Sequence, residues 1–509
     1  LYHRPDLFAD ALHPDAEGAM ILAETVYAAM TGNHGGLQLP AIYTSHMVIQ
    51  RDKPFLLHGT ADAECKVTAT LGKEKLRTTA APDGSWALTF KARKATREPL
   101  TLTVTDGNST LTLPDILVGE VWLCSGQSNM VFMLRQATNA EANIAEALAQ
   151  KDLRIYDMRP RVYTDPVMWD STSLAALNRL DYYVPTQWAP LTEDNAPHFS
   201  AIAYHFGAML ADSLDVPVGL ICNAVGGAPI ESFIDRRTIE YHPELVDILT
   251  DWRNNDRIQD WVRGRGAYNI KQSPKALQRH PYEPCYLYEA GIAPLAGYPL
   301  RGVIWYQGES NAHNVELFAT EFPTLVDSWR RAWSDEAMPF HFVQLSSINR
   351  PSWPHFRDVQ RQLADAIPHC EMAVSSDKGD ANDIHPREKK PVGERLARQA
   401  LKYDYGFDIV PCGPVLIEAV AEDGKVVLSF DYADGLKTSD GQALRCFEVA
   451  GQDERFVPAE AVIVDGKVVL TSSVAEPAYV IYGWQGYTTA NLVNGEDLPA
   501  STFKAVVAQ

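Results

Sequence analysis

The chain has 509 residues, of which 46 % are hydrophobic and 22 % charged, proportions typical of a globular protein. This length is too great for one ordinary domain and is enough for about three or four. The formal net charge of −20 at pH 7 argues against nucleic acid or an anionic membrane as a partner. It leaves open a small anionic substrate, which needs only a local cationic group.

Seven cysteines are scattered along the chain without a C-x-x-C pair, so their spacing suggests no metal site. The odd count leaves at least one thiol free. Cys124 and Cys222 lie in apolar runs that are typical of a protein core. No apolar run is long enough to span a bilayer, and no secretion signal is visible in this chain.

Residues 1–36 are expected to close one domain before the next begins. After Asp10-Ala-Leu-His13, apolar residues at helical spacing predict a one-faced helix from Ala16 to Met30. The sequence Asn33-His-Gly-Gly36 then ends the helix.

Residues 37–115 change to short alternating runs separated by turn sequences such as Pro82-Asp-Gly84, the pattern of an antiparallel β-sandwich. The predicted strands are Phe55–His58, Lys66–Thr70, Trp86–Phe90, Leu100–Thr105 and Thr110–Leu113.

Residues 116–405 alternate buried strands with helices, which predicts a parallel, doubly wound sheet with its active groups at the carboxyl ends of the strands. The strand candidates are Val118–Cys124, Val218–Asn223, Gly302–Tyr306, Phe340–Leu345 and Met372–Ser376. The helix candidates are Ala140–Gln150, Ala201–Leu214, Phe318–Trp333 and Val392–Tyr403.

Residues 406–509 return to a β pattern, with strands predicted in Val426–Asp431, Ala461–Leu470 and Tyr479–Trp484. Asp465-Gly466 is a good hairpin turn. The predicted architecture is therefore α/β, a doubly wound parallel sheet flanked by β-sandwich domains.

Ser128 is the candidate nucleophile. It lies in Gly126-Gln-Ser-Asn-Met130, directly after the strand candidate that ends at Cys124, where the N–H groups of a helix start can hold an oxyanion. The second glycine of a G-x-S-x-G elbow is missing, so an α/β-hydrolase is disfavoured. A helix-capping role for Ser128 stays open. Ser125 is a rival hydroxyl that we expect to bond the turn backbone.

His385 is the candidate base, because an imidazole titrates near neutrality and Pro386 restrains its loop. It lies far from Ser128 in the chain, so only the fold can bring the two together. Asp380, Asn382 and Asp383 cluster before His385 and could supply an orienting carboxylate, although such a cluster is also ordinary loop composition. Glu309 is a further possible orienting carboxylate.

Oxyanion donors have two candidate sources. Gly226-Gly227 can present backbone N–H groups where a side chain would obstruct, although a glycine pair serves any tight turn. Gln307 offers a side-chain amide, or is a buried polar residue satisfied by loop backbone. Aromatic residues could form an apolar wall for a sugar ring or belong to the core; they are Trp305, Tyr306 and Trp353.

Together these motifs resemble the SGNH hydrolase superfamily and, within it, the sialate O-acetylesterases. Four blocks carry the resemblance in order, and it extends from about Leu37 to the end of the chain. The blocks are Val118–Met130, Pro217–Gly227, Trp305–Asn311 and Asp383–Ala397.

The resemblance implies Ser128 as nucleophile, His385 as base, and an oxyanion site formed by the Ser128 N–H, Gly226 or Gly227, and Gln307. It implies removal of an acetyl ester from a sugar, by analogy 9-O-acetyl sialic acid, without a metal or organic cofactor. It also suggests a secreted, periplasmic or lysosomal-type setting. One departure concerns the triad, because Asn382 occupies the position where the superfamily has aspartate. The third member is therefore Asp383, Asp380, Glu309 or none.

Asp10 and His13 also fit the D-x-x-H pattern, and a predicted helix follows them. This resembles the closing block of another SGNH domain, so residues 1–36 are interpreted as the tail of an upstream domain of that type. The alternative is an incidental histidine in an N-terminal helical arm.

Two other functions stay open. One is the same chemistry on other acetylated glycans, such as xylan. The other, of a different class, is a non-catalytic carbohydrate-binding protein, which the two flanking β regions make plausible.

Overall fold

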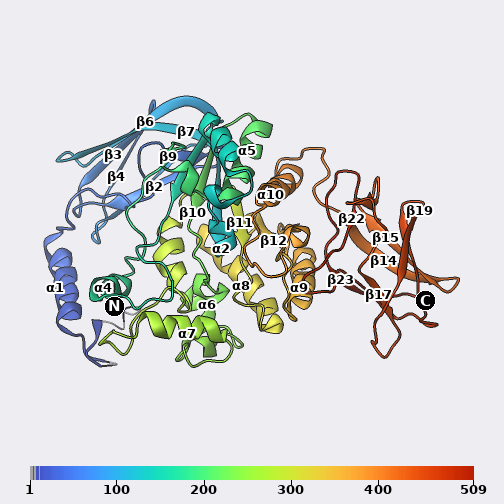
Figure 1. Ribbon diagram of the computed structural model, residues 1–509. Helices are drawn as coiled ribbons and strands as arrows, with labels where there is room; N and C mark the ends of the chain where they lie inside the picture. Colours follow the sequence, from blue (N-terminus) through green and yellow to red (C-terminus); the bar gives the residue numbers. More distant parts are fainter. Residues whose placement is uncertain (1–3, 5–6, 11) are drawn as a thin grey trace.

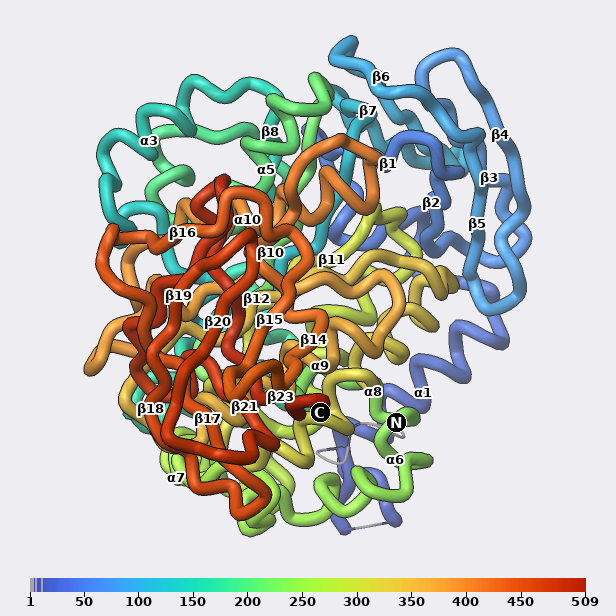
Figure 2. Tube along the Cα trace, turned by 90° about the vertical axis from the view of Figure 1, so that its right-hand side faces the viewer, coloured from blue at the N-terminus to red at the C-terminus, as the bar shows by residue number. Residues whose placement is uncertain are grey.

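The computed structural model describes residue 4, residues 7–10 and residues 12–509. Figure 1 shows β-strands at one end, a central region of strands and helices, and a second group of strands at the other end. Figure 2 views the molecule from the C-terminal end and shows the last strands lying across the central region. Within the described part of the chain, no helix is both long enough and apolar enough to cross a membrane.

The central sheet is parallel and runs in the order β13-β12-β11-β7-β10-β8, with β9 added antiparallel at one edge. This confirms the predicted parallel pairing. Its strands are β7 Thr110–Gly126, β8 Leu153–Asp157, β9 Ala189–Pro190, β10 Val218–Cys222, β11 Gly302–Tyr306, β12 Phe340–Val343 and β13 Met372–Ala373.

Helices pack on both faces of this sheet. Trp122 and Trp305 point to opposite faces, because Trp122 is the register partner of Gly302 and successive side chains alternate. On one face Trp122 contacts Phe206 of α5, and α10 packs beside α5. On the other face Trp305 contacts Trp329 of α8. The helices of this region are α2 Ser128–Val131, α3 Ala140–Ala149, α4 Ser171–Asn178, α5 Ala201–Leu214, α6 Arg236–Glu240, α7 Asp260–Asn269, α8 Val315–Trp333, α9 Trp353–Ala366 and α10 Lys390–Tyr403.

Strand β7 is shared between two parts of the structure. Its first half pairs antiparallel with β6, and its second half lies between β10 and β11 in the central sheet. The predicted boundary at residue 115 therefore falls inside one continuous strand. The other N-terminal strands are β1 Val48–Gln50, β2 Phe55–Thr60, β3 Lys66–Leu71, β4 Glu74–Thr79, β5 Ser85–Phe90 and β6 Thr96–Thr105. Their buried side chains join one hydrophobic core with the central sheet.

The C-terminal strands enclose a core of their own, between Ala419 and Val507. The predicted hairpin turn is confirmed, because Val464 pairs with Lys467 and both Asp465 and Gly466 have positive φ. The strands are β14 Val415–Glu422, β15 Lys425–Asp431, β16 Lys437–Thr438, β17 Phe447–Ala450, β18 Val457–Pro458, β19 Glu460–Val464, β20 Lys467–Thr471, β21 Tyr479–Tyr482, β22 Leu492–Val493 and β23 Phe503–Val506.

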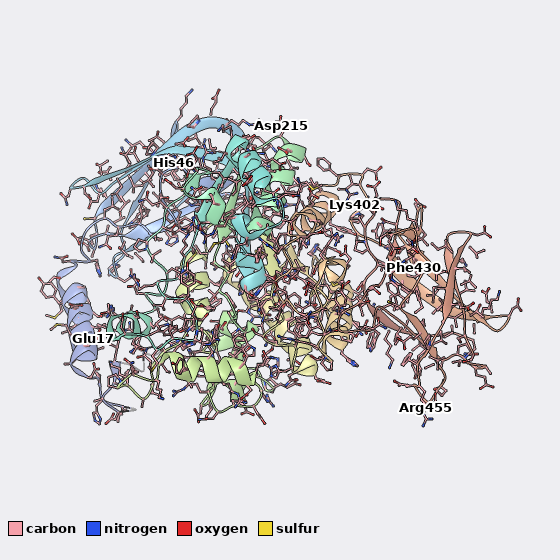
Figure 3. All side chains as sticks on the ribbon, viewed as in Figure 1. Glu17, His46, Asp215, Lys402, Phe430 and Arg455 are labelled. Carbon is pink, nitrogen blue, oxygen red and sulfur yellow. The ribbon has the colours of Figure 1, made fainter. Side chains whose placement is uncertain are left out.

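Helix α1 spans Ala16–Thr31, as the apolar spacing predicts, but much of its apolar face is exposed. Met30, for example, has 82 % of its surface accessible. Before this helix, Asp10 Oδ2 lies 2.9 Å from His13 Nδ1, while Ala11 between them is outside the described residues. Figure 3 shows side chains filling the central layers, with charged residues such as Asp215 and Arg455 on the outer surface.

A buried arginine on α9 attaches the C-terminal region to the central one. The Arg357 guanidinium is fully buried and donates to the backbone carbonyls of Gly483, Gln485 and Gly486, and to Thr502 Oγ1. Burial without a carboxylate partner lowers its pKa to about 9. The loop that follows β21 is therefore held by hydrogen bonds from a helix of the central region.

We expect Arg357→Met to lower the free energy of unfolding by about 3 kcal/mol, because several carbonyls lose their donor in a buried position. Urea unfolding followed by tryptophan fluorescence measures this change. The control is Asp365→Asn on the same helix, which removes an exposed carboxylate that lies 3.6 Å from Arg361 and is expected to cost less than about 1 kcal/mol. Equal unfolding midpoints for the two variants would contradict the anchoring role of Arg357.

Candidate active site

Three neighbouring strands end at the same edge of the central sheet, and a predicted motif follows each of them. In the register of β7, β10 and β11, Cys124 pairs with Cys222 and Gly126 pairs with Tyr306. Ser128, the Gly226-Gly227 turn and Glu309 therefore emerge side by side. This confirms the expectation that polar groups collect at the carboxyl ends of the parallel strands.

The turn that carries Ser128 requires glycine at position 126. Gly126 has φ +132°, and a Cβ there would lie 2.1 Å from the carbonyl oxygen of Tyr306. Only glycine lets β7 continue so close to β11 and then turn sharply into α2. Ser128 is the first residue of that short helix, so its hydroxyl lies at the rim of the sheet. Ser125, the rival hydroxyl, is fully buried, and within the described residues its Oγ has no hydrogen-bond partner.

The structure brings Ser128 and His385 into contact. Ser128 Oγ lies 2.8 Å from His385 Nε2, within hydrogen-bond distance. The loop before His385 is ordered by its own side chains: Asp380 Oδ1 accepts from the N–H groups of Asn382 and Asp383. A hydroxyl held against an imidazole in this way can lose its proton as it attacks a carbonyl carbon.

None of the three candidate carboxylates hydrogen-bonds to the far nitrogen of His385. Asp383 Oδ1 is 4.0 Å from His385 Nδ1 and instead accepts from the His385 backbone N–H at 2.8 Å. The Asp380 carboxylate accepts from the backbone N–H of Asn382 in the same loop, and Glu309 Oε1 accepts from Asn129 Nδ2. The imidazole is thus oriented through its loop and its contact with Ser128, with the Asp383 charge close by.

A buried polar network lies behind the Ser128–His385 contact. Asn129 Nδ2 donates to Glu309 Oε1 at 2.6 Å and to the carbonyl of Ile384 at 2.9 Å. Lys389 Nζ donates to Asn129 Oδ1 at 2.5 Å. The three side chains are buried to 96 % or more of their surface. One amide group therefore links the turn after Ser128 to the residue before His385.

Burial and charge shift the pKa values of these groups. Burial raises the pKa of Glu309 above its ordinary value, although the hydrogen bond from Asn129 opposes this. Burial lowers the pKa of Lys389 to about 7, with the Glu309 and Asp383 charges acting the other way. The pKa of His385 is lowered by burial and then by the Lys389 charge, while Asp383 raises it. The imidazole therefore stays neutral, and able to accept a proton, to lower pH than a free histidine.

Three residues that line one pocket have backbone N–H groups without a protein acceptor in the described structure. In the part of the chain that the structure describes, the N–H groups of Ser128, Gly226 and Gly227 donate to no protein acceptor. Gly227 has φ +71°, and a Cβ there would lie 2.4 Å from the Tyr282 hydroxyl, so this turn also needs glycine. Hydrogen bonds to the carbonyls of Gly226 and Gly227 fix the turn; their donors are Thr164, Tyr282 and Ser310.

The side chain of Gln307 does not reach this pocket. Its Nε2 donates to Asn311 Oδ1 at 2.6 Å and to the Ala228 carbonyl at 3.3 Å, and the residue is fully buried. Its amide nitrogen is therefore bonded inside the protein, while its buried Oε1 has no hydrogen-bond partner among the described residues.

Ser128 and His385 line a pocket of about 570 Å³ whose walls are largely apolar. The aromatic side chains in its lining are Tyr163, Tyr182, Trp261 and Tyr282. Trp305, Tyr306 and Trp353, which the sequence suggested as a possible sugar wall, are at most 2 % exposed and belong to the core instead. Trp261 and Tyr282 pack edge to face beside Gly227 and supply the wall that the sequence analysis did not identify.

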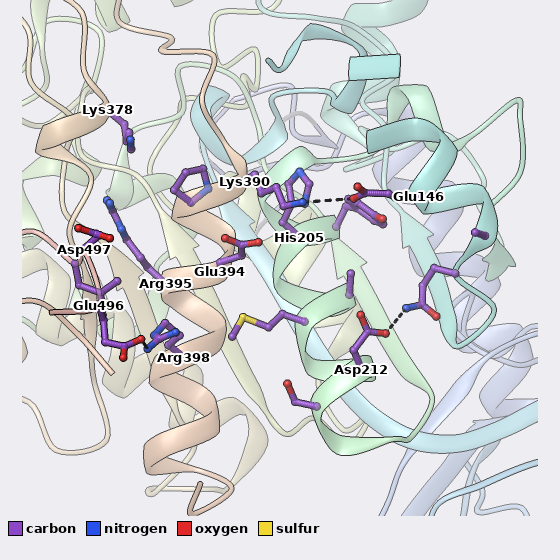
Figure 4. Close-up of a pocket in the computed structure, with 18 residues that line it drawn as sticks. Glu146, His205, Asp212, Lys378, Lys390, Glu394, Arg395, Arg398, Glu496 and Asp497 are labelled. Atoms are coloured by element: carbon purple, nitrogen blue, oxygen red, sulfur yellow. Dashed lines mark hydrogen bonds and ion pairs between the residues drawn. The ribbon is translucent and has the colours of Figure 1, made fainter. Parts of the chain in front are cut away.

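A second, wider hollow lies between α5, α10 and the C-terminal region (Figure 4). Its cations are already neutralised: Lys390 pairs with Glu146, and Arg398 pairs with Glu496. His205 in its wall is buried and its Nε2 is screened from the cavity. Since it shares no lining residue with the Ser128 pocket, we assign the candidate chemistry to the latter.

Sequence reasoning missed Asn129, Lys389 and Trp261. Asn129 follows Ser128 directly and Lys389 lies four residues after His385, so proximity to the two motifs was an available signal. Trp261 lies on α7, whose sequence lacks a clear apolar periodicity, and nothing near it marks a site.

We expect Lys389→Met to raise the pKa of His385, because a cation that disfavours the imidazolium is removed. Asp383→Asn should lower it, because an anion that favours the imidazolium is removed. Titration of the imidazole signals by NMR measures both shifts. Since His385 accepts a proton only when neutral, the acidic limb of kcat/KM for an ester should move to higher pH in the first variant and lower pH in the second. Shifts of the same sign would contradict this electrostatic account.

Known proteins similar to this chain include several acetylesterases. Residues 254–402 match the family model described as carbohydrate esterase, sialic acid-specific acetylesterase. The sialate O-acetylesterase of Mus musculus is 28 % identical over 504 residues, which cover 88 % of this chain and 90 % of the relative. The Homo sapiens sialate O-acetylesterase is 29 % identical, with 78 % of this chain and 77 % of the relative covered.

Among solved structures, a carbohydrate acetylesterase from Xanthomonas citri superposes with a TM-score of 0.76 at 29 % identity, covering 92 % of this chain and 99 % of that one. The resemblance drawn from the four motifs is thereby confirmed. Over most of its length the chain is similar to the sialate O-acetylesterases, which are carboxylic ester hydrolases, and residues 254–402 match the model of a sialic acid-specific acetylesterase.

Proposed function

We propose that this protein is a serine esterase that removes O-acetyl groups from sugars, with 9-O-acetylated sialic acid as its substrate. The observation that carries the proposal is the 2.8 Å contact between Ser128 Oγ and His385 Nε2 at the edge of an aromatic-lined pocket. The names of the related enzymes and the description of the matched family support the choice of sugar.

The reaction we propose is a two-step acyl transfer. His385 takes the proton of Ser128 as Oγ attacks the acetyl carbonyl, and an acetyl-enzyme forms when the sugar oxygen leaves with that proton. Water, deprotonated by His385, then attacks the acetyl group and releases acetate and free Ser128. Neither step needs a metal or organic cofactor.

The tetrahedral oxyanion would be held by the N–H groups of Ser128 and of Gly226 or Gly227, since these residues line the pocket and their N–H groups have no acceptor among the described residues. In this proposal Gln307 supports the Gly226-Gly227 turn through its bond to Ala228, and Asp383 acts on His385 as a nearby charge. Gln307→Ala would lower kcat by about 10²–10³ if its amide were instead an oxyanion donor.

The same resemblance leads us to propose an SGNH-type fold for residues 116–405, with residues 37–115 and 406–509 as flanking β domains. We also propose that residues 1–36 derive from a preceding domain of the same type. The Asp10–His13 contact and the exposed apolar face of α1 support that origin.

We expect Ser128→Ala to lower acetate release from 9-O-acetyl sialic acid by about 10⁴-fold or more, because the nucleophile is lost while the pocket remains. Acetate release from a panel of acetylated sugars, including acetyl xylan, measures this for both proteins. Acetate release from acetyl xylan but not from 9-O-acetyl sialic acid would contradict the proposed sugar, whereas the proposed serine esterase reaction would be retained.

A binding protein with an inactive site is the alternative of another class. A serine-reactive phosphonate should form an adduct at Ser128 of the folded wild-type protein, detected by mass spectrometry of its peptides. Absence of an adduct in protein that still binds acetylated sugar would favour the binding module over the esterase.

A further inference from the structure

We infer that Arg350 binds the carboxylate of an anionic sugar and so determines which acetylated sugars the enzyme prefers. The inference rests on the proposed function and adds the residue that recognises the substrate class. Arg350 lines the same pocket as Ser128 and His385. A sialic acid carries its carboxylate at C1 and its 9-O-acetyl group at the far end of a glycerol chain. One pocket must therefore hold the ester at the nucleophile and the carboxylate at a separate cation.

Four arginines line the pocket, and two of them are already used. Arg159 pairs with Asp157 at 2.7 Å, and Arg265 donates to the carbonyl of Thr164. Arg135 and Arg350 remain, and among the described residues neither has a carboxylate partner within ion-pair distance. A guanidinium that lines a pocket and has no carboxylate partner is suited to a ligand carboxylate, because its two parallel N–H groups match the two oxygens.

Arg135 and Arg350 are both exposed and neither side chain has a hydrogen-bond partner in the described structure, but Arg350 packs on an aromatic ring. The Arg350 guanidinium lies over the Trp353 ring, 5.0 Å from its centroid. Its own loop is tied to the loop of His385, since Asn349 N–H donates to the Ala381 carbonyl. A cation that is positioned before the substrate arrives loses less conformational freedom on binding than a mobile one.

The C-terminal region supports this position. Ile348 N–H donates to the carbonyl of Gly486. The Arg357 guanidinium, on helix α9, donates to the same carbonyl. The segment that carries Arg350 is thus bonded on one side to the His385 loop and on the other to the loop after β21. This gives the C-terminal β region a role in substrate recognition as well as in stability.

The test compares two substrates that differ only in charge: 9-O-acetyl sialic acid and the same sugar with its C1 carboxylate converted to an amide. The measured quantity is the ratio of their kcat/KM values for acetate release. For the wild-type protein we expect a preference for the acid of about 10- to 100-fold, the size of a charged hydrogen-bonded pair. Arg350→Gln should reduce this ratio to about one, and Arg350→Lys should retain part of it.

Arg135→Gln is the matched control, because it removes the other unpaired arginine of the pocket, and it should keep the wild-type ratio. The ratio is internal to each variant, so partial misfolding lowers both rates and leaves it unchanged. An unchanged ratio in Arg350→Gln, or its loss in Arg135→Gln, overturns the inference. A wild-type ratio near one would overturn the role of Arg350 and leave the proposed esterase activity intact. Acetate release from acetyl xylan but not from sialic acid would overturn the proposed substrate itself.

Discussion

The site depends on the two hydrogen bonds donated by the side-chain amide of Asn129. One reaches Glu309, after strand β11, and the other reaches the carbonyl of Ile384, next to His385. Because Asn129 follows Ser128 directly, this amide fixes the distance between two loops that lie far apart in the chain. Other contacts between these loops involve residues further along each loop, such as the hydrogen bond from Arg387 Nε to the Gln136 carbonyl.

Holding that amide requires a buried anion and a buried cation, neither of which is stable alone in the interior. Lys389 and Glu309 reach Asn129 from opposite sides, so each charge is partly satisfied through the amide between them. The cost of burial appears as a raised carboxyl pKa and an amine pKa lowered to about 7. The Lys389 charge also acts on His385, which links the rigidity of the site to the protonation of its base.

The surrounding fold supplies the rigidity that this arrangement needs. Strand β7 belongs to both the N-terminal strands and the central sheet, so Gly126 and Ser128 emerge from a strand that is paired on both sides. On the opposite flank, the buried Arg357 binds the loop of the C-terminal region that supports Arg350. Each peripheral β region is thus hydrogen-bonded to a segment that leads into the lining of the pocket: β6 pairs with β7, which precedes Ser128, and Gly486 bonds Ile348, which precedes Arg350.

Elements with a strong, local apolar pattern can be predicted from the residues alone. The strand Gly302–Tyr306 and the helix Ala201–Leu214 were predicted with the bounds that the structure has, and parallel order followed from their alternation. The helix α9 was not among the predicted helices, and its first residue, Trp353, was interpreted as part of a possible apolar wall for a sugar ring. Motif chemistry also identified Ser128 and His385 as partners, since few side chains can serve as nucleophile and base.

Which polar groups meet depends on how the chain folds in three dimensions. The Asn129 amide, the Lys389 ammonium and the Arg350 guanidinium acquire their roles from neighbours that lie roughly 180 to 260 residues away or on other loops. The same is true of Asp383 and Gln307, whose residue types suit a triad or an oxyanion site but whose hydrogen bonds go elsewhere. Residue type and periodicity are local properties, whereas hydrogen-bond partners and burial depend on how the strands are ordered in space.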